Sequence, residues 1–594
     1  MQLAVIFERI QTNMLMHIFY TSNKILYAFF LFITVLQTSS CVRGQLGENV
    51  DGEYHNGMVV TAHPVASKVG LEILKKGGNA VDAAVAVQFA LAVVYPNAGN
   101  IGGGGFMVYR AADGATDALD FRETAPANAS KDMYLDAQGN VISDLSIYGH
   151  LSAGVPGTVD GMVQAHKKYG KLKWADLVTP AIELAKNGFK ITAMQAREMN
   201  KHKSDFVKYN HPSNTYLIKN EEWKADDILK QEDLATTLEL IRDKGRAGFY
   251  EGTTADNIVG EMQYGKGLIN KDDLRNYKAV WRRPLEGGYR GYKVISMPPP
   301  SSGGVCLLQL LKMVEPYDVK NAGWNTERSV QIMTEAERRV YADRSAYLGD
   351  PDYFPVPVKM LLDPVYLNKR MNDFSFEKAT PSSKIKPGEF GPVAPVFNTK
   401  ESEQTTHFSI VDIEGNAVSI TTTLNNSYGS HVFVQGSGFL LNDEMDDFSA
   451  KPGVPNLYGV TGGEANAIQP GKRMLSSMTP TIVEYKGKLF MVVGTPGGST
   501  IITTVFQTIV NVIDHDMSMQ DAVDAGRVHF QWFPDTIQYE KKAIDSVVVE
   551  KLKTKGYNFK VRTAIGRTDA ILKTRWGYYT SGADKRGDDA ALGW

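Results

Sequence analysis

The stretch Thr405-Thr406-His407-Phe408-Ser409 stands where a long polar segment runs into a predicted strand, and its first residue could act as a nucleophile. If the Thr405 hydroxyl attacked the carbonyl of Gln404, an N-to-O acyl shift and hydrolysis would release Thr405 with a free α-amine. The ordinary pKa of such an amine is about 7.7 to 8.0, so it could serve as the general base for its own hydroxyl. The junction therefore predicts a self-cleaving chain whose new first residue is catalytic.

Most other catalytic signatures do not occur in the sequence. It has no Gly-x-Ser-x-Gly elbow, no His-Glu-x-x-His pair, no Walker loop and no Cys/His spacing that suits a metal. The glycine run 102–105 is followed by a predicted strand, whereas a phosphate loop needs a helix, so the run indicates tight backbone packing. Cys41 and Cys306 are too few for a disulfide framework or a zinc cluster. We expect neither a metal nor an organic cofactor.

Helices are predicted in the first two thirds of the chain. Apolar residues recur at helical spacing before Gly77, and a second helix is expected over 80–94, capped by Asn79 and apolar almost all round. A strand is expected over 106–109. Further helices are predicted over 179–188, with Thr179 as the cap and Pro180 in its first turn, and over 326–348.

The last third of the chain favours strands. Residues 371–404 are polar, carry several prolines and show no period, which predicts an exposed linker. One hairpin is expected over 407–411 and 417–424, and another over 481–485 and 489–493, before a helix near 501–513. Strands between buried helices indicate an α/β (α+β) layered sheet sandwich.

The N-terminal region has the character of an export signal. The apolar run 25–36 follows Lys24 and is too short to span a bilayer comfortably. Cys41 follows a loose match to a bacterial lipobox, so residues 1–41 are predicted to be a signal peptide or a lipoprotein signal, with a possible lipid anchor at Cys41. The protein is expected to be periplasmic, envelope-associated or secreted. The net charge of −2, from 64 basic and 66 acidic residues, does not suggest a nucleic-acid partner.

Six motifs, in the same order along the chain, resemble those of the gamma-glutamyltransferase (gamma-glutamyltranspeptidase) family from about Glu53 to the C-terminus. They are Asp120-Phe121-Arg122-Glu123-Thr124-Ala125-Pro126, Met297-Pro298-Pro299-Pro300-Ser301-Ser302-Gly303-Gly304, Thr405-Thr406-His407, Asp446-Asp447-Phe448, Leu475-Ser476-Ser477-Met478 and Gly494-Thr495-Pro496-Gly497-Gly498. The resemblance implies the four-layer αββα sandwich of N-terminal-nucleophile hydrolases. It also implies autocatalytic cleavage between Gln404 and Thr405 into a large subunit, 42–404, and a small catalytic subunit, 405–594, that stay together as a heterodimer.

The resemblance also implies how a glutamyl donor would be held. Arg122 would bind the donor's α-carboxylate, helped by hydrogen bonds from Ser476 and Ser477, and the α-ammonium would be met by a set of three residues. These three are Asn425, Glu444 and Asp447. Without the resemblance, Arg122 could be an ordinary surface ion pair, the two serines a plain turn, and the acidic run 443–447 a solvated face or a calcium loop.

Four further residues would act on the reacting groups or cover them. The backbone N–H groups of Gly497 and Gly498 would form the oxyanion hole, and Thr423 would bond to the hydroxyl of the nucleophile. Tyr458 would be the gate of a lid loop, 452–459. A strand-to-helix turn and a core threonine are the alternatives for the glycine pair and for Thr423.

The implied reaction transfers a gamma-glutamyl group from glutathione or a related amide to water, an amino acid or a peptide through a threonyl ester. One alternative is a related acylase that removes a glutaryl-type side chain from a beta-lactam such as a cephalosporin, which would need no ammonium site. Another is a catalytically silent envelope-binding protein built on the same fold. Retention of Asn425, Glu444 and Asp447 argues against the acylase, and an intact Thr405 argues against the silent protein.

Overall fold

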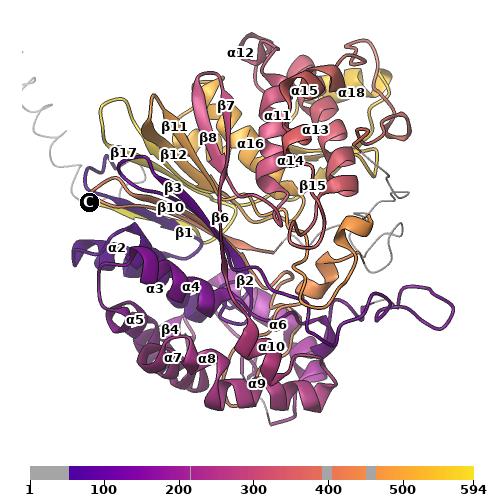
Figure 1. Ribbon diagram of the computed structural model, residues 1–594. Coiled ribbons are helices and arrows are strands. Elements are labelled where there is room, and N and C mark those ends of the chain that lie inside the picture. The colour runs from indigo at the N-terminus through magenta and orange to yellow at the C-terminus, as the bar shows by residue number, and fades with distance from the viewer. Residues whose placement is uncertain (1–51, 143, 214–215, 391–403, 450–462) are drawn as a thin grey trace, which may run out of the picture. The chain divides into compact units, whose positions relative to one another are not determined.

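Two β-sheets packed face to face form the centre of the unit Glu53–Trp594 (Figure 1). The structure is a computed structural model that describes residues 52–142, 144–213, 216–390, 404–449 and 463–594. Within these ranges, no helix has the length and apolarity needed to cross a membrane.

The first sheet contains seven of the described strands, all antiparallel to their neighbours, in the order β18-β1-β9-β10-β2-β3-β6. Their bounds are β1 Met58–Thr61, β2 Gly104–Arg110, β3 Thr116–Asp120, β6 Val280–Arg282, β9 Thr406–Val411, β10 Ala417–Thr423 and β18 Ala590–Gly593. Successive side chains alternate between the two faces. In β2, Phe106 and Val108 pack between the sheets, whereas Met107 and Tyr109 pack against the outer helices.

The second sheet contains six of the described strands, also antiparallel, in the order β17-β16-β12-β11-β8-β7. Their bounds are β7 Leu285–Tyr289, β8 Tyr292–Ser296, β11 Thr481–Tyr485, β12 Lys488–Gly494, β16 Asp569–Lys573 and β17 Tyr579–Ala583. Smaller sheets pair β4 Phe189–Lys190 with β5 Ile228–Leu229, and join β13 Val528–His529, β14 Ile537–Glu540 and β15 Phe559–Arg562. Both predicted hairpins, β9 with β10 and β11 with β12, are confirmed.

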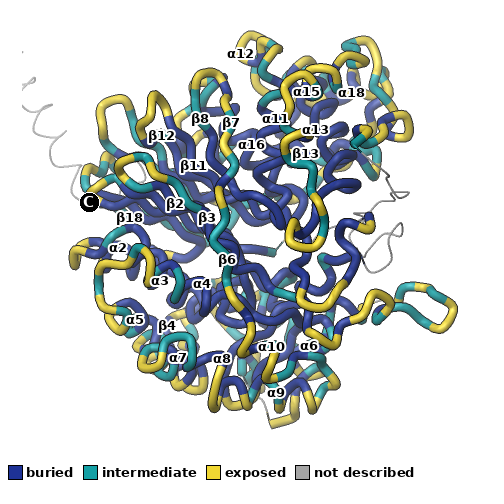
Figure 2. Tube along the Cα trace, viewed as in Figure 1, coloured by how far each residue is buried: buried dark blue, intermediate teal, exposed yellow. Residues whose placement is uncertain are grey.

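Helices cover the outer faces of both sheets, which completes four layers (Figure 1). On the side of the first sheet lie α2 Pro64–Lys75, α3 Ala80–Val94, α4 Thr158–Tyr169, α5 Trp174–Asn187, α6 Ala193–Tyr209, α7 Glu232–Lys244, α8 Ala247–Tyr250, α9 Gly252–Gly265 and α10 Lys271–Asn276. On the other side lie α11 Gly303–Val314, α12 Val319–Ala322, α13 Glu327–Tyr347, α14 Val358–Leu361, α15 Pro364–Arg370, α16 Thr500–Ile513, α17 Met519–Asp524 and α18 Ser546–Thr554. Figure 2 shows the central strands and the inner helices buried and the outer turns exposed.

Helix α3 lies in the interior, as its composition predicts. Every residue from Ala80 to Val94 is buried, and the helix begins with a capping box in which the Asn79 side chain accepts hydrogen bonds from the backbone of Val81 and Asp82. Helix α13 also has its predicted extent, with Thr326 as its cap.

The glycine run 102–105 has the packing role that the sequence favours. A Cβ atom added to Gly102 or Gly103 would lie 2.1 Å from the carbonyl oxygen of Leu440 or Thr423, respectively. Real Cβ atoms do not approach other atoms so closely, so only glycine fits at these positions. The run therefore brings the backbone before β2 against the end of β10.

One prediction of local structure is wrong. The helix expected to start at Thr179 begins at Trp174; the Thr179 hydroxyl donates to the carbonyl of Ala175 instead of capping, and Pro180 lies inside the helix.

Over its described part, 371–390, the segment predicted to be a linker is mostly exposed or half-buried, with a few buried residues that anchor it. There the Ser382 hydroxyl is buried and donates to the carbonyl of Trp532, 2.5 Å away, while its N–H donates to Asp535.

Candidate active site

Thr405 immediately precedes β9, a strand in the interior of the first sheet, and is 5% exposed. Together with Gln404 it lines a cavity of about 340 Å³. The geometry described below is that of the continuous chain, in which Gln404 is joined to Thr405.

Thr423, the last residue of β10, contacts the bond that is predicted to break. Its hydroxyl donates to the carbonyl oxygen of Gln404 over 3.0 Å and accepts a hydrogen bond of 2.8 Å from the N–H of Asn425. Because the hydroxyl oxygen accepts from Asn425, its single proton is free to point at the Gln404 carbonyl. A proton in this position polarises the carbonyl that a nucleophile would attack.

His407 follows the predicted nucleophile closely but is held between the sheets. Its Nδ1 lies 2.8 Å from the Thr421 hydroxyl and its Nε2 lies 3.1 Å from the Ser409 hydroxyl. Burial lowers the pKa of His407 to about 3, so the ring is neutral at physiological pH. These contacts describe a packing residue of the sheet rather than a base.

Gly497 and Gly498 occupy the turn between β12 and α16. Their φ angles are +135° and +56°, in the region that favours glycine, and Gly497 lines the same cavity as Thr405. Their carbonyls accept hydrogen bonds from the backbone of Thr500 and Ile501. In the described parts of the chain their own N–H groups are not engaged, which suits the predicted role as donors to an oxyanion.

Arg122 lies at the centre of a buried acidic cluster. Its guanidinium is 1% exposed, contacts a carboxylate oxygen of Glu444 at 2.6 Å and donates a hydrogen bond to Asp447, while Glu123 lies 3.7 Å away. Burial lowers the pKa of Arg122, but the attraction of Glu444 and Asp447 outweighs it and raises the pKa above its usual range. The residues predicted to bind the two opposite charges of a donor therefore bind each other here.

The acids around Arg122 outnumber the single cation. Burial raises the pKa of Glu123 to about 8 and that of Asp446 to about 7, and it raises the pKa values of Asp443 and Glu444 well above their ordinary value. Among the described residues, both carboxylate oxygens of Glu123 lack a hydrogen-bond partner, whereas the Glu444 carboxylate is engaged by its ion pair with Arg122. The raised pKa values favour a proton on several of these acids at neutral pH, and a cation bound among them would favour their ionised forms instead.

Ser476 and Ser477 follow Leu475 and are held by residues of the segment before Thr405. The carbonyl of Ser476 accepts from both the N–H and the hydroxyl of Ser302, and the Ser477 hydroxyl accepts from Arg344 at 2.9 Å. Arg122 donates to the carbonyl of Leu475, which precedes them.

The contacts join these groups into one continuous path. It runs from the Gln404 carbonyl through Thr423 to Asn425, whose side chain donates to the Asp443 carbonyl at 3.1 Å, and then along the chain to Glu444. Glu444 contacts Arg122, which reaches the segment of the two serines. The structure thus brings together the predicted site residues except Tyr458, which lies outside the described residues together with Cys41.

Several side chains near the site carried no sequence signal. Arg344, which orients Ser477, lies within a helix whose pattern predicts only burial. The cavity beside Thr405 is lined by five cations and one carboxylate from distant segments, namely Arg197, Lys201, Arg562, Arg567, Arg586 and Glu198. Only the fold could show that these residues line the same cavity.

Comparison with known proteins places this site in a family. The family described as gamma-glutamyltranspeptidase matches residues 66–594 of the chain. The chain belongs to the gamma-glutamyltranspeptidase family. It is 47% identical over 540 residues to the glutathione hydrolase proenzyme of Escherichia coli (strain K12), and the match covers 91% of this chain and 92% of that protein.

Solved structures agree with the family assignment. The gamma-glutamyltranspeptidase of Helicobacter pylori is 46% identical with a TM-score of 0.55, over 58% of this chain and 99% of that one. The cephalosporin acylase of Bacillus halodurans is 26% identical with a TM-score of 0.81, over 93% of this chain and 98% of that one. The predicted family, fold class and enzyme class are therefore confirmed. The roles of single residues stay predictions.

Proposed function

We propose that the protein is a gamma-glutamyltransferase and glutathione hydrolase that cleaves itself before Thr405 and then uses this residue as its nucleophile. The observation that carries the proposal is the hydrogen bond from Thr423 to the Gln404 carbonyl, set directly beside the cavity that Thr405 lines. The 47% identity to a glutathione hydrolase proenzyme supports the substrate and the processed precursor.

Self-cleavage would begin with attack of the Thr405 hydroxyl on the Gln404 carbonyl carbon. The carbonyl oxygen would take up negative charge, which the proton of Thr423 is placed to stabilise. Collapse of this intermediate breaks the C–N bond, which frees the Thr405 α-amine with a proton and leaves an ester on the Thr405 oxygen. Water then hydrolyses this ester to the Gln404 carboxylate and the Thr405 hydroxyl. The products are the large subunit, 42–404, and the small subunit, 405–594.

The donor would be recognised by exchange of ion pairs. The α-carboxylate of a glutamyl group would take the place of an acidic side chain on Arg122, and its α-ammonium would neutralise the released Glu444 or Asp447. Asn425 would also bind the α-ammonium, and the hydroxyls of Ser476 and Ser477 would donate hydrogen bonds to the α-carboxylate. A zwitterion fits this cluster because it supplies both charges at once.

Catalysis would then proceed in two steps. The Thr405 amine would take the proton of the hydroxyl as that oxygen attacks the gamma-carbonyl, and the N–H groups of Gly497 and Gly498 would stabilise the oxyanion. The leaving amine would depart with that proton, and water or an acceptor amine would cleave the ester. The basic wall of the cavity suits substrates and acceptors that carry carboxylates.

The second candidate function is that of an acylase, because a cephalosporin acylase with 26% sequence identity to this chain has the same fold. An acylase donor of the glutaryl type has no α-ammonium, and such a donor would leave the acidic cluster around Arg122 uncompensated.

The apolar run 25–36 supports export to the periplasm or the cell surface, with Cys41 as the candidate for a lipid anchor.

A pair of chromogenic anilides tests the function. The purified, processed protein is expected to hydrolyse the gamma-glutamyl anilide and to leave the glutaryl anilide, which differs only by the α-amino group. Faster cleavage of the glutaryl anilide would favour the acylase over the gamma-glutamyltransferase. If a processed protein cleaved neither anilide, both proposed functions would be wrong.

A further inference from the structure

Two histidines and an aspartate from distant segments meet at α6, the helix whose residues Glu198 and Lys201 line the cavity of Thr405. His202 and Asp205 lie on α6, and His431 lies in the segment after β10. One ligand atom from each lies within 4.8 Å of the others.

Both imidazoles turn the same nitrogen toward the Asp205 carboxylate. Nδ1 of His202 is 3.5 Å and Nδ1 of His431 is 3.9 Å from the same oxygen, Oδ2. These distances are too long for hydrogen bonds. They are slightly longer than the ~3.3 Å that separates two ligands bound at about 2.0–2.1 Å to a tetrahedral Zn²⁺.

The opposite ring nitrogens are turned toward acceptors. Nε2 of His431 lies 3.0 Å from the Ser427 carbonyl and therefore carries the proton, which leaves a lone pair on Nδ1. Nε2 of His202 faces the carboxylate of Glu198 at 3.8 Å. A metal-binding histidine almost always donates its second N–H to a carbonyl or a carboxylate in this way.

The lone pair of His431 is buried and unsatisfied. His431 is 1% exposed, and its Nδ1 has no hydrogen-bond partner among the described residues; the same holds for both ring nitrogens of His202. A lone pair that faces a carboxylate is repelled by it, and a cation bound between them would remove the repulsion.

Aromatic side chains enclose the site. Tyr148 packs on His431 with ring centroids 5.2 Å apart, and Tyr428 packs on His202 at 5.4 Å. Asp205 is 39% exposed, which leaves a path of entry.

We propose that His202, Asp205 and His431 form a binding site for a divalent transition-metal ion, Zn²⁺, that ties α6 to the segment after β10. Two imidazole nitrogens and one carboxylate oxygen are a donor set that zinc accepts, with water as the fourth ligand. Neither the predicted catalytic mechanism nor the donor site uses these three residues.

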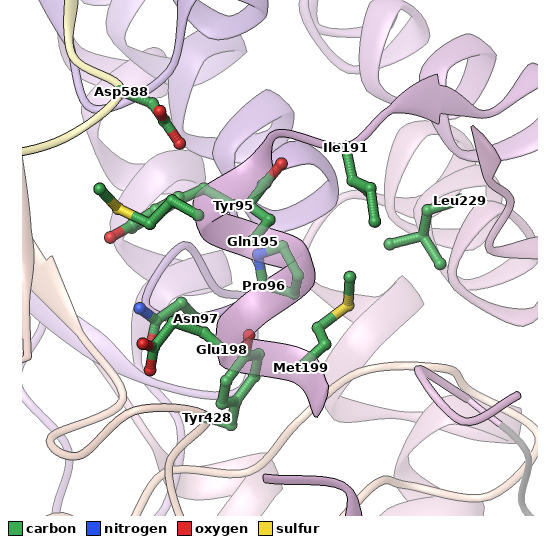
Figure 3. Close-up of a pocket in the computed structure, with 11 residues that line it drawn as sticks. Tyr95, Pro96, Asn97, Ile191, Gln195, Glu198, Met199, Leu229, Tyr428 and Asp588 are labelled. Carbon is green, nitrogen blue, oxygen red and sulfur yellow. The ribbon is translucent and has the colours of Figure 1, made fainter. Parts of the chain in front are cut away.

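The position of the site gives the ion a structural consequence. Glu198 lies beside Asn97 and Tyr428 in a small cavity (Figure 3), and Glu198 and Lys201 also line the cavity of Thr405. The ion would therefore fix the wall of α6 that faces the site. If the chain is cleaved as proposed, it would join the large subunit to the small one.

Equilibrium dialysis of the metal-stripped protein against Zn²⁺ alone tests the proposal, with bound zinc measured by elemental analysis. Wild type is expected to hold one Zn²⁺ per chain with a rise in Tm, and Thr405→Ala should do the same because the uncleaved chain already presents all three residues. This variant separates failure of the zinc site from failure of the proposed cleavage.

Variants decide whether these residues hold the ion. Loss of a second-shell partner alone costs about 10–100-fold in metal affinity, so Asp205→Asn and His202→Gln, which remove ligands, are expected to weaken Zn²⁺ by at least about 100-fold. The matched control His150→Gln, from another buried histidine that pairs with a carboxylate, Glu261, at 2.9 Å, should bind zinc like wild type. Absence of saturable binding in wild type, or equal binding by Asp205→Asn while it keeps the wild-type Tm without metal, would overturn the proposal.

Discussion

At the scale of single residues, the account depends on where a few protons and charges sit. The proton of Thr423 is directed at the Gln404 carbonyl because the N–H of Asn425 occupies the other side of the hydroxyl. Ion pairs with Glu444 and Asp447 orient the Arg122 guanidinium, so the proposed donor would meet a guanidinium whose orientation is already fixed. Each arrangement can be tested by removing one group.

Replacement of Thr423 by valine keeps the shape of the side chain and removes the proton. We expect Thr423→Val to slow self-cleavage by about 10²–10³-fold, the usual cost of losing one oxyanion donor. The measurement is the rate at which two bands replace the precursor on a denaturing gel. Thr422→Val, which loses a hydrogen bond to the Gly104 carbonyl on the same strand, should cleave at the wild-type rate even if it is less stable.

Replacement of Arg122 by lysine keeps the charge and removes the planar fork. Because hydrogen bonds to charged groups contribute about 1.5–3 kcal/mol, Arg122→Lys should raise KM for a gamma-glutamyl donor by about 10–150-fold. Steady-state kinetics of the processed enzyme measures this effect. Arg110→Lys, at an equally buried arginine that pairs with Glu484 at 2.6 Å, should keep KM, and an unchanged KM in Arg122→Lys would remove Arg122 from the donor site.

At the scale of elements, the glycine run before β2 positions the end of the hairpin formed by β9 and β10. Gly103 lets the backbone approach the Thr423 carbonyl, and Asn100 donates to that same carbonyl at 3.0 Å. The end of β10, and with it the Thr423 hydroxyl, is therefore set by residues far away in the sequence.

A methyl group at Gly103 should disturb this contact. Since its Cβ would lie 2.1 Å from a backbone oxygen, Gly103→Ala is expected to lower Tm and to slow self-cleavage. Gly260→Ala is the matched control: Gly260 lies inside α9 with nothing within 4 Å of a Cβ, so the change should raise stability by about 0.5–1 kcal/mol. Calorimetry of both variants measures these shifts, and normal Tm and cleavage in Gly103→Ala would contradict the packing argument.

Elements with a strong local signal were predictable, and those decided by tertiary contacts were not. Asn79 and the apolar run after it specify α3, and alternating side chains specify the hairpin of β9 and β10. The helix start was predicted at Thr179 because proline is common in the first turn of a helix, but in the structure Pro180 lies inside α5. Ser382 is polar, yet it is buried by Trp532 and Asp535, which no local pattern could reveal.

The same limit applies to the site. Its motifs could be assigned through the resemblance, because Thr405, Arg122 and the glycine turn stand in recognisable contexts. The pairing of Arg122 with Glu444 and Asp447 and the basic wall of the cavity required the fold, since these residues are far apart along the chain.

At the scale of the whole molecule, the proposed subunits are interleaved. The first sheet takes β1, β2, β3 and β6 from the segment before Thr405 and β9, β10 and β18 from the segment after it. The second sheet is mixed in the same way, with β7 and β8 beside strands of the later segment. Cleavage of one peptide bond should therefore leave the two subunits associated.

Buried histidines predict sensitivity to acid. Burial lowers the pKa of His407 and of His529 to about 3, whereas an unfolded histidine titrates near 6.5. Between these values the unfolded chain binds more protons, so stability is fully present above about pH 6.5 and is lost as pH falls toward 3, by up to ~1.4 kcal/mol per pH unit for each group.

Thermal unfolding between pH 6.5 and pH 4 measures this loss. Tm is expected to fall with pH, and His529→Gln should make the slope shallower, whereas the exposed His211→Gln should leave it unchanged. Equal slopes in all three proteins would contradict a contribution from buried histidine.

The central claim is that Thr405 frees itself and becomes the nucleophile, and N-terminal sequencing of the purified protein on a denaturing gel tests it most directly. The account predicts two bands for wild type, the smaller beginning Thr405-Thr406-His407, and one uncut band for Thr405→Ala. A single uncut wild-type band after prolonged incubation, or a small subunit that begins at another residue, would contradict it.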